Sequence, residues 1–160
     1  MTERTPQASQ GCELRVGDVI GQRQVVFTRQ TLLDYAAASG DANPIHRLDE
    51  AATAVGLPGV IAHGMLTMGT AIQLVVDWAG DPGAVIDYEV RFARPVPVPR
   101  EGQAELEVSG TVHRLDPAAE AAVISLNVTQ GETKVLAKAR ATVRWHPGPD
   151  TRQPEATPWR

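Results

Sequence analysis

The sequence lacks three features, and each absence excludes a class of protein. Cys12 is the single cysteine, which excludes an intrachain disulfide and a cysteine-rich zinc site. No stretch approaches the roughly 18 apolar residues of a membrane span, and the N-terminal residues have no apolar signal-peptide core. A basic surplus is also missing, because 19 acidic residues outweigh 15 basic ones and leave a net charge of −4. We therefore expect a soluble, cytoplasmic protein whose partners include neither membranes nor nucleic acids.

The residues that are present suit one folded domain. The chain has 160 residues, of which 42% are apolar, and single domains commonly hold roughly 100–200 residues. Residues 1–12 are polar, and residues 147–160 include Pro147, Pro149, Pro154 and Pro158. These compositions predict a flexible N-terminal segment at 1–12, a domain at 13–146 and a flexible tail at 147–160.

The first half of the domain carries helical patterns. A strand is expected from Val19 to Phe27, followed by a helix that Thr28 caps and Gly40 ends. A short helix is expected from about Asp49 to Val55.

A longer helical pattern starts at Met65, and it is apolar on most sides. One face consists of Met65, Met68, Gly69, Ile72, Val75, Val76 and Ala79, widened by Leu66 and Leu74. Only a narrow polar stripe remains, formed by Thr67, Thr70, Gln73 and Asp77. Such a helix is predicted to be enclosed by other structure.

From Ala84 onward the apolar residues recur at every second position, which is typical of half-buried strands. The inward-facing sets are Ile86, Tyr88, Val90 and Phe92; Ala104, Leu106, Val108 and Val112; Ala122, Ile124, Leu126 and Val128; and Val135, Ala137, Ala139, Ala141, Val143 and Trp145. They predict an antiparallel sheet of about five strands with one wet face. A one-sided sheet and an apolar helix bury each other if the sheet curls around the helix. The predicted class is therefore α+β with a hot dog fold, and the uncovered helix and sheet edge predict at least a dimer.

The stretch SGDANPIH, residues 39–46, places a carboxyl group and an imidazole five positions apart. Pro44 restricts both itself and Asn43, so the chain must be extended or turned there. Asp41 and His46 are then expected to face one point, while Asn43 bridges the turn or holds a water molecule. The alternative is an ordinary surface turn in which Asp41 caps the next segment and His46 is solvated.

Two longer stretches resemble a known family. YAAASGDANPIH and GLPGVIAHGMLTMG are similar to the MaoC-like (R)-specific enoyl-thioester hydratases and dehydratases, also called hydratase 2. GVIAHGMLTMG, GDPGAV and VRFARPVPVP most resemble the B subunits of mycobacterial (3R)-hydroxyacyl-ACP dehydratases. The resemblance spans about Arg15 to Val143.

The resemblance implies a hot dog fold with Asp41 and His46 as the catalytic pair. The implied reaction is reversible hydration of a trans-2-enoyl thioester, or dehydration of a (3R)-3-hydroxyacyl thioester, on ACP or CoA. A base must remove a C2 proton and an acid must protonate the departing hydroxyl. We assign the first role to His46 and the second to Asp41, a carboxyl group expected to be shielded from water, and the reverse assignment stays open.

Residues near the start of the long helix are further site candidates. The backbone N–H of Gly64 can stabilise negative charge on the thioester oxygen, although a glycine there also suits close packing. His63 is expected to be a wall residue of the site rather than a catalyst. His113 and His146 look ordinary, and neither a metal nor another cofactor is expected.

Arg91, Arg94 and Arg100 form a small basic run. They suit the phosphates of coenzyme A or the acidic face of an acyl carrier protein, or else a solvated strand face. The expected partners are an acyl-ACP or acyl-CoA substrate and a second hot dog subunit, in a homodimer or a heterodimer.

Two other functions fit a hot dog chain. A non-catalytic acyl-binding or scaffolding subunit would not need both Asp41 and His46. A hot dog acyl thioesterase usually places a carboxylate on the central helix, and the SGDANPIH loop would have no role in it.

Overall fold

The computed structural model of the protein describes residues 14–145. The predicted flexible ends, with Cys12, His146 and Trp159, lie outside the described residues. The elements in chain order are β1 (Val19–Phe27), α1 (Arg29–Ser39), the 3₁₀ helix η1 (Pro44–His46), α2 (Asp49–Ala54), α3 (Gly64–Ala79), the 3₁₀ helix η2 (Pro82–Ala84), β2 (Val85–Phe92), β3 (Ala104–Asp116), β4 (Ala121–Gln130), β5 (Thr133–Lys134) and β6 (Leu136–Arg144). None of the helices within residues 14–145 is long and apolar enough to cross a membrane.

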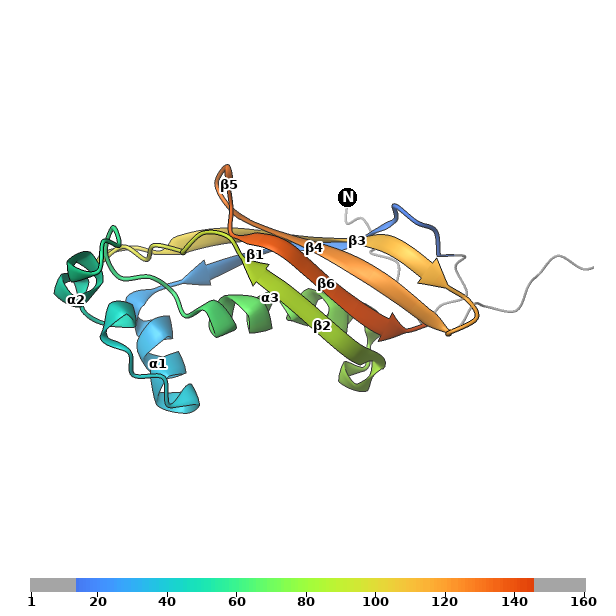
Figure 1. The fold of residues 1–160 in the computed structure, drawn as a ribbon, viewed down its shortest axis with the longest axis horizontal. Helices are drawn as coiled ribbons and strands as arrows, with labels where there is room; N and C mark the ends of the chain where they lie inside the picture. The colour runs from blue at the N-terminus through green and yellow to red at the C-terminus, as the bar shows by residue number, and fades with distance from the viewer. Residues whose placement is uncertain (1–13, 146–160) are drawn as a thin grey trace, which may run out of the picture.

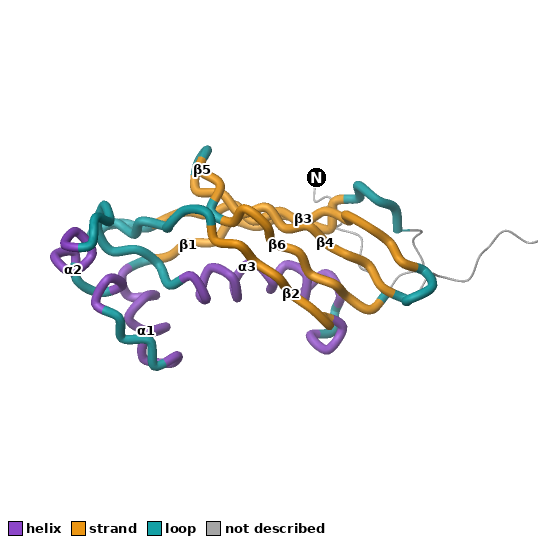
Figure 2. The backbone as a smooth tube through the Cα atoms, in the orientation of Figure 1, coloured by secondary structure: helices purple, strands orange, loops and turns teal. Residues whose placement is uncertain are grey.

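The strands form one antiparallel sheet that curves over α3 (Figures 1 and 2). The strand order is β1-β3-β4-β6-β2, and the two-residue β5 extends β4. This arrangement confirms the predicted α+β hot dog fold, with β5 as a sixth, very short strand. Strands β1 and β2 are the two edges of the sheet.

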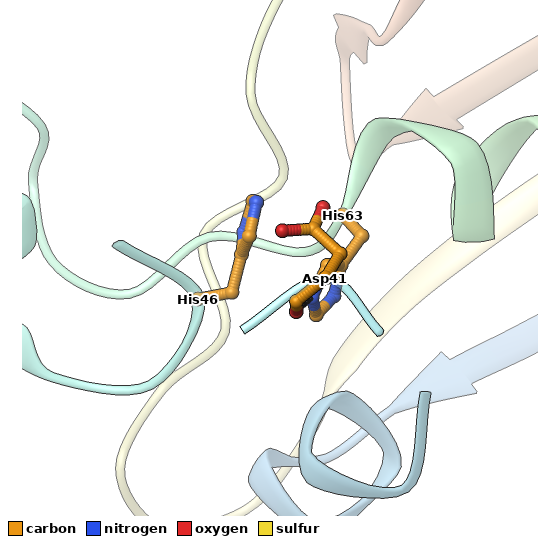
Figure 3. A group of neighbouring side chains, drawn as sticks. All are labelled: Asp41, His46 and His63. Atoms are coloured by element: carbon orange, nitrogen blue, oxygen red, sulfur yellow. Dashed lines mark hydrogen bonds between the residues drawn. The ribbon is translucent and has the colours of Figure 1, made fainter. Parts of the chain in front are cut away.

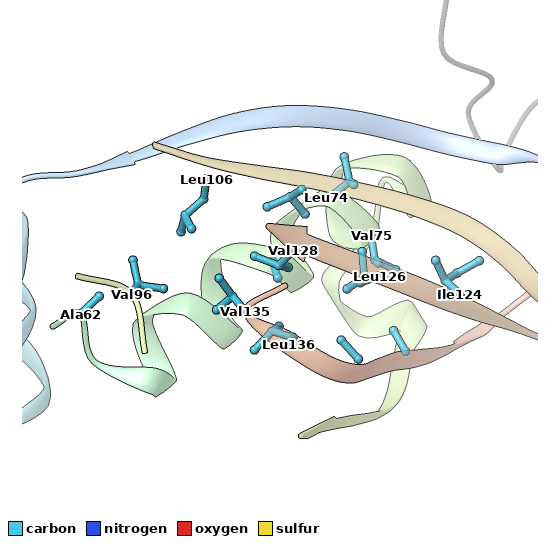
Figure 4. Packing of buried hydrophobic residues seen from close by; sticks show 14 of the residues in the cluster. Ala62, Leu74, Val75, Val96, Leu106, Ile124, Leu126, Val128, Val135 and Leu136 are labelled. Atoms are coloured by element: carbon cyan, nitrogen blue, oxygen red, sulfur yellow. The ribbon is translucent and has the colours of Figure 1, made fainter. Parts of the chain in front are cut away.

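The core lies between the sheet and α3 (Figure 4). The apolar residues predicted to face inward on β3 and β4 are buried: Ala104, Leu106, Val108, Val112, Ala122, Ile124, Leu126 and Val128. The predicted alternation is wrong at the start of β4, where Ala121 and Val123 are buried as well. The alternation proposed for β6 is wrong at its start, where Val135 and Leu136 are both buried and Ala137 is exposed. The register of β6 against β2 shifts between Leu136 and Lys138, so the inside–outside alternation is interrupted there and continues from Ala139.

The buried face of α3 differs from the predicted one. Its buried residues are Thr67, Ala71, Leu74, Val75 and Trp78. Thr67, predicted in the polar stripe, is 2% exposed, whereas Met65, predicted on the apolar face, is 58% exposed. Because the helix is apolar over most of its circumference, hydropathy alone does not define which apolar face meets the sheet.

Helices α1 and α2, with the loop between them, lie beyond one end of the sheet and contribute few residues to the core. They stand beside the N-terminal end of α3 (Figure 1). Thr28 caps α1 with its hydroxyl, and Gly40 ends it with a left-handed backbone (φ +78°) and an N–H donated to Ala36. The loop with Asp41 and His46 starts at this point.

Candidate active site

Side chains of the loop itself fold the segment between Asp41 and His46. The Asp41 carboxylate accepts the Asn43 N–H at 3.2 Å, and the Asn43 side chain accepts the Ile45 N–H at 3.3 Å. Pro44 occupies the first turn of η1, where a missing N–H costs nothing. Asn43 therefore bridges the turn, one of the two roles considered for it, and its side chain is exposed.

His46 is held in one orientation by the backbone of another segment. Its ring is buried, and Nδ1 lies 2.8 Å from the carbonyl oxygen of Ile61. A carbonyl oxygen only accepts, so Nδ1 carries the proton, and in the neutral ring Nε2 has a free lone pair. The contact thus prepares Nε2 to accept a proton.

The ring of His63 lies against His46. The two imidazoles are stacked, with their ring centroids 3.9 Å apart. The ring centroid of Tyr35 lies 4.8 Å from that of His63. His63 Nε2 donates a hydrogen bond of 3.2 Å to the backbone carbonyl of Asp41. Its Nδ1 is buried and has no hydrogen-bond partner among the described residues. Burial lowers the pKa of His63, so this ring is a neutral support beneath His46.

Asp41, His46 and His63 come together at one place (Figure 3). One polar side-chain atom from each residue lies within 4.8 Å of those from the other two. The Asp41 carboxylate points toward the His46 ring. Asp41 is exposed in the single protomer, so the expected shielding of this carboxyl from water is not provided by the described residues of this chain.

Two histidines and a carboxylate are metal-binding residue types, but their orientation here does not suit a shared ion. A metal binds an imidazole along the lone pair in the ring plane. The rings of His46 and His63 are stacked, with 29° between their planes, so their lone pairs do not converge on one point. The arrangement suits proton transfer better than metal binding.

A cavity of about 250 Å³ connects His46 to the start of α3. Its lining includes His46, Gly64, Thr67, Phe92 and Arg94. As the first residue of α3, Gly64 has an N–H without an intrahelical acceptor. A Cβ at Gly64 would lie 3.2 Å from the Phe92 ring, so the glycine also allows close packing. Both functions considered for this glycine are compatible with the structure.

Phe92 lines the cavity although the sequence does not predict it as a site residue. The pattern placed it on the apolar face of β2, and that face did not indicate which end of the strand meets Gly64. The side chain is 50% exposed and forms one wall of the cavity.

The three arginines of the basic run have different surroundings. Arg94 lines the cavity, and Arg91 is exposed on β2. Arg100 donates to the Asp49 carboxylate at 3.0 Å, so it serves an ion pair within the protein.

A second, larger cavity of about 430 Å³ lies over β1, β3 and β4. It is lined by Gln22, Arg23, Gln24, Glu107, Val108, Ser109, Asn127 and Thr129. It contains no imidazole, and its single carboxylate has no second proton-transfer group beside it. The smaller cavity is therefore the candidate active site.

Comparison with known proteins identifies the family. A family model for the MaoC-like domain matches residues 13–137. The chain belongs to this family. A 65-residue stretch is 49% identical to the 3-hydroxyacyl-thioester dehydratase X of Mycobacterium tuberculosis, and it covers 41% of this chain and 22% of that relative. The chain therefore spans only a small part of this curated relative.

Solved structures agree with the family assignment. A MaoC-like dehydratase superposes with a TM-score of 0.81 at 38% identity, over 88% of this chain and 42% of that one. An (R)-hydratase from Pseudomonas aeruginosa superposes with a TM-score of 0.71 at 26% identity, over 84% and 83% of the two chains. A (3R)-hydroxyacyl-ACP dehydratase complex from Mycobacterium tuberculosis shares the fold, with a TM-score of 0.64 at 20% identity, over 82% and 98%.

Proposed function

We propose that this chain is a hydro-lyase that interconverts (3R)-3-hydroxyacyl and trans-2-enoyl thioesters. The observation that carries the proposal is the Nε2 of His46, which has no hydrogen-bond partner among residues 14–145 and is fixed beside a carboxylate in a cavity that also contains the first N–H of α3. Membership of the MaoC-like family supports the reaction class.

In the dehydration direction His46 Nε2 removes a proton from C2, and the electron pair moves onto the thioester oxygen. The Gly64 N–H stabilises the resulting enolate, helped by the positive end of the α3 dipole. The C3–O bond then breaks, and Asp41 gives its proton to the departing hydroxyl, which leaves as water. Transfer of the C2 proton from His46 to Asp41, directly or through water, restores both groups.

The roles of the two groups can be separated by isotope exchange. In D₂O, His46→Ala should abolish both C2–H exchange and loss of water from 3-hydroxybutyryl-CoA. Asp41→Asn should retain C2–H exchange and lose the elimination of water. The opposite pattern would establish the reverse assignment.

A direct assay separates the lyase from the two other functions. Addition of the protein to crotonyl-CoA should reduce the absorbance of the enoyl-thioester band, and His46→Ala should not do so. His113→Ala is the matched control, because that histidine is exposed on β3. Release of free thiol would instead indicate a thioesterase, and an unchanged spectrum with every partner tested would indicate a scaffold. The one carboxylate on α3, Asp77, is paired with Arg23, which leaves no free helix carboxylate for a thioesterase.

The substrate's carrier is proposed to be coenzyme A or an acyl carrier protein, which share a phosphopantetheine phosphate. Arg94 is the charged residue other than histidine in the cavity lining, and no ion pair to it is seen among residues 14–145. Crotonyl-phosphopantetheine should therefore be hydrated with a lower KM than crotonyl-pantetheine, which differs from it only in lacking the phosphate. Arg94→Gln should remove this difference. Comparing the CoA thioester with a crotonyl carrier protein would then identify the preferred carrier.

A second hot dog subunit is proposed to cover the open side of this protomer. Met65, Ile86 and Phe92 are each at least half exposed, and β2 is a free sheet edge. Tyr88 on β2 donates to the Met68 carbonyl at 3.2 Å, so this edge and the exposed side of α3 are neighbours. A partner there would also shield Asp41. Light scattering after size exclusion should show a dimer of this chain, or a monomer that pairs only with a related chain. A stable monomer that binds neither would contradict the proposal.

A further inference from the structure

Asp49, the first residue of α2, joins three parts of the chain. Its Oδ1 accepts a hydrogen bond from Arg29 Nη2 at 2.6 Å and another from the Val60 N–H at 3.1 Å. Its Oδ2 accepts one from Arg100 Nη2 at 3.0 Å. We call Asp49, Arg29, Arg100 and the Val60 N–H the Asp49 clamp. Hydrogen bonds from Arg29, Val60 and Arg100 hold the pKa of Asp49 well below its usual range, so the clamp is charged at neutral pH.

The backbone beside the carboxylate leaves room for it. A Cβ at Gly59 would lie 3.3 Å from Asp49 Oδ1, and Gly59 has φ +149°, a conformation rare for other residues. A glycine at this position lets Val60 approach the carboxylate closely.

The clamp continues into the strand-like segment that supports His46. Arg29 Nε donates to the Val98 carbonyl at 2.8 Å, and the Val98 N–H donates to the Val60 carbonyl at 2.9 Å. Two residues further, the Ala62 N–H donates to the Val96 carbonyl at 2.8 Å. The segment from Val60 to Ala62 is therefore fixed on both sides of Ile61.

Ile61 links this fixed segment to the candidate site. Its carbonyl accepts the Nδ1 proton of His46 at 2.8 Å, and its N–H donates to the Ile45 carbonyl at 3.3 Å. The same segment leads directly to His63 and Gly64. A displacement at Val60 would therefore move the acceptor of His46 relative to the loop, and a shift of about 1 Å can cost about 10²-fold in rate.

We propose that Asp49 is a positioning residue: through Val60 it fixes the Ile61 carbonyl that sets the tautomer and direction of His46. Asp49 itself does not line the cavity, so its effect on catalysis is indirect. This proposal rests on the proposed function for its kinetic test only, and its spectroscopic test does not depend on that function.

The spectroscopic arm measures the tautomer of His46 in the full-length protein. Long-range ¹H–¹⁵N correlations of ¹⁵N-histidine protein, recorded at about pH 9, distinguish a protonated from a bare Nδ1. The native protein should show His46 protonated at Nδ1 only. Asp49→Asn keeps the size of the side chain and removes its charge, and it should give a mixture of the two tautomers.

The kinetic arm measures hydration of crotonyl-CoA. Asp49→Asn should lower kcat by about 10- to 100-fold and change KM by a smaller factor, because a misdirected base slows the proton transfer more than it weakens substrate binding. Arg29→Lys, which cannot bridge Asp49 and the Val98 carbonyl with two nitrogens of one planar group, should give a smaller loss of the same kind.

Asp77→Asn is the matched control, since Asp77 also pairs with an arginine, Arg23, but on α3 and β1. It should leave both the tautomer and kcat unchanged. The proposal would be overturned if the Asp49→Asn protein kept the native His46 tautomer. It would also be overturned if Asp49→Asn lowered kcat no more than Asp77→Asn does. If Asp49→Asn does not fold, Arg29→Lys is judged by the same two readouts. If the native protein shows His46 protonated at Nδ1 but does not hydrate crotonyl-CoA, the proposed function is refuted. The role of Asp49 is then decided by the His46 tautomer of the Asp49→Asn protein.

Discussion

The sheet with α3 and the segment from Gly40 to His63 are held together in different ways. Between sheet and helix, many apolar side chains are buried, and no single contact is decisive. In the segment, a small number of directional hydrogen bonds fix the chain, such as those to Asp49, Asn43 and Ile61. The difference teaches that stability and catalytic geometry reside in different parts of this small domain. Substitutions in the two parts should therefore separate the two properties.

The largest expected effect is on activity, from His46→Ala. Loss of the proposed base should reduce crotonyl-CoA hydration by about 10²–10⁴-fold, because a positioned acid–base group contributes that much. His46 lies in the segment from Gly40 to His63. The urea midpoint of unfolding should therefore change much less for His46→Ala than for a variant of the core between the sheet and α3. If the His46→Ala protein instead unfolds at a much lower urea concentration than the native protein, stability and catalytic geometry do not reside in separate regions.

Ile124→Ala should show the opposite behaviour. Ile124 is fully buried on β4, and truncation of such a residue costs about 2–5 kcal/mol of unfolding free energy. Urea denaturation measures this loss, and kcat per folded molecule should stay near the native value. Leu33→Ala is the control, because Leu33 is 42% exposed on α1 and should cost less than about 0.5 kcal/mol.

Gly110→Ala tests the packing of the sheet from the other direction. A Cβ at Gly110 would lie 2.7 Å from Ile20 Cγ1, and Gly110 is buried. Overpacking of this kind should cost about 1–3 kcal/mol by urea denaturation. A neutral result would show that β1 and β3 yield easily, contrary to the account of a closely packed sheet.

The smallest expected effect is the pH dependence of stability from His63. Burial lowers the pKa of this imidazole, so below the unfolded value of about 6.5 the unfolded chain binds a proton that the folded chain does not. The free energy of unfolding should reach its full value at a pH well above about 6.5, and it should decline as the pH falls from about 7.5 to 5.5. His63→Phe should show a shallower decline in urea midpoints over this range. An equal decline would mean that His63 is not the group responsible, since the lowered pKa values of Asp49, Asp77 and Glu89 act below this window.

The sequence predicted the fold well where local patterns decide it. The predicted inward-facing residues of β3 and β4 are buried, and the turn of Asp41 to His46 is made by its own side chains. The loop motif therefore identified the segment in which His46 and Asp41 come together.

Features that depend on distant contacts could not be predicted from the sequence. Arg100 meets Asp49 across 51 positions of sequence, so the basic run alone could not show that one arginine is occupied. Phe92 meets Gly64 from another element, and the burial of Thr67 follows from the direction in which α3 faces the sheet. The exposure of Asp41 likewise depends on what covers the open side of the protomer, which local sequence does not specify.

The stereochemistry of crotonyl-CoA hydration tests the central claim most directly. If the Asp41–His46 loop performs the chemistry beside Gly64, the purified protein, alone or with its hot dog partner, should give (3R)-3-hydroxybutyryl-CoA. His46→Ala should form this product about 10²–10⁴-fold more slowly, and His113→Ala should form it at the native rate. Formation of the (3S) product, or the native rate from His46→Ala, would contradict the account.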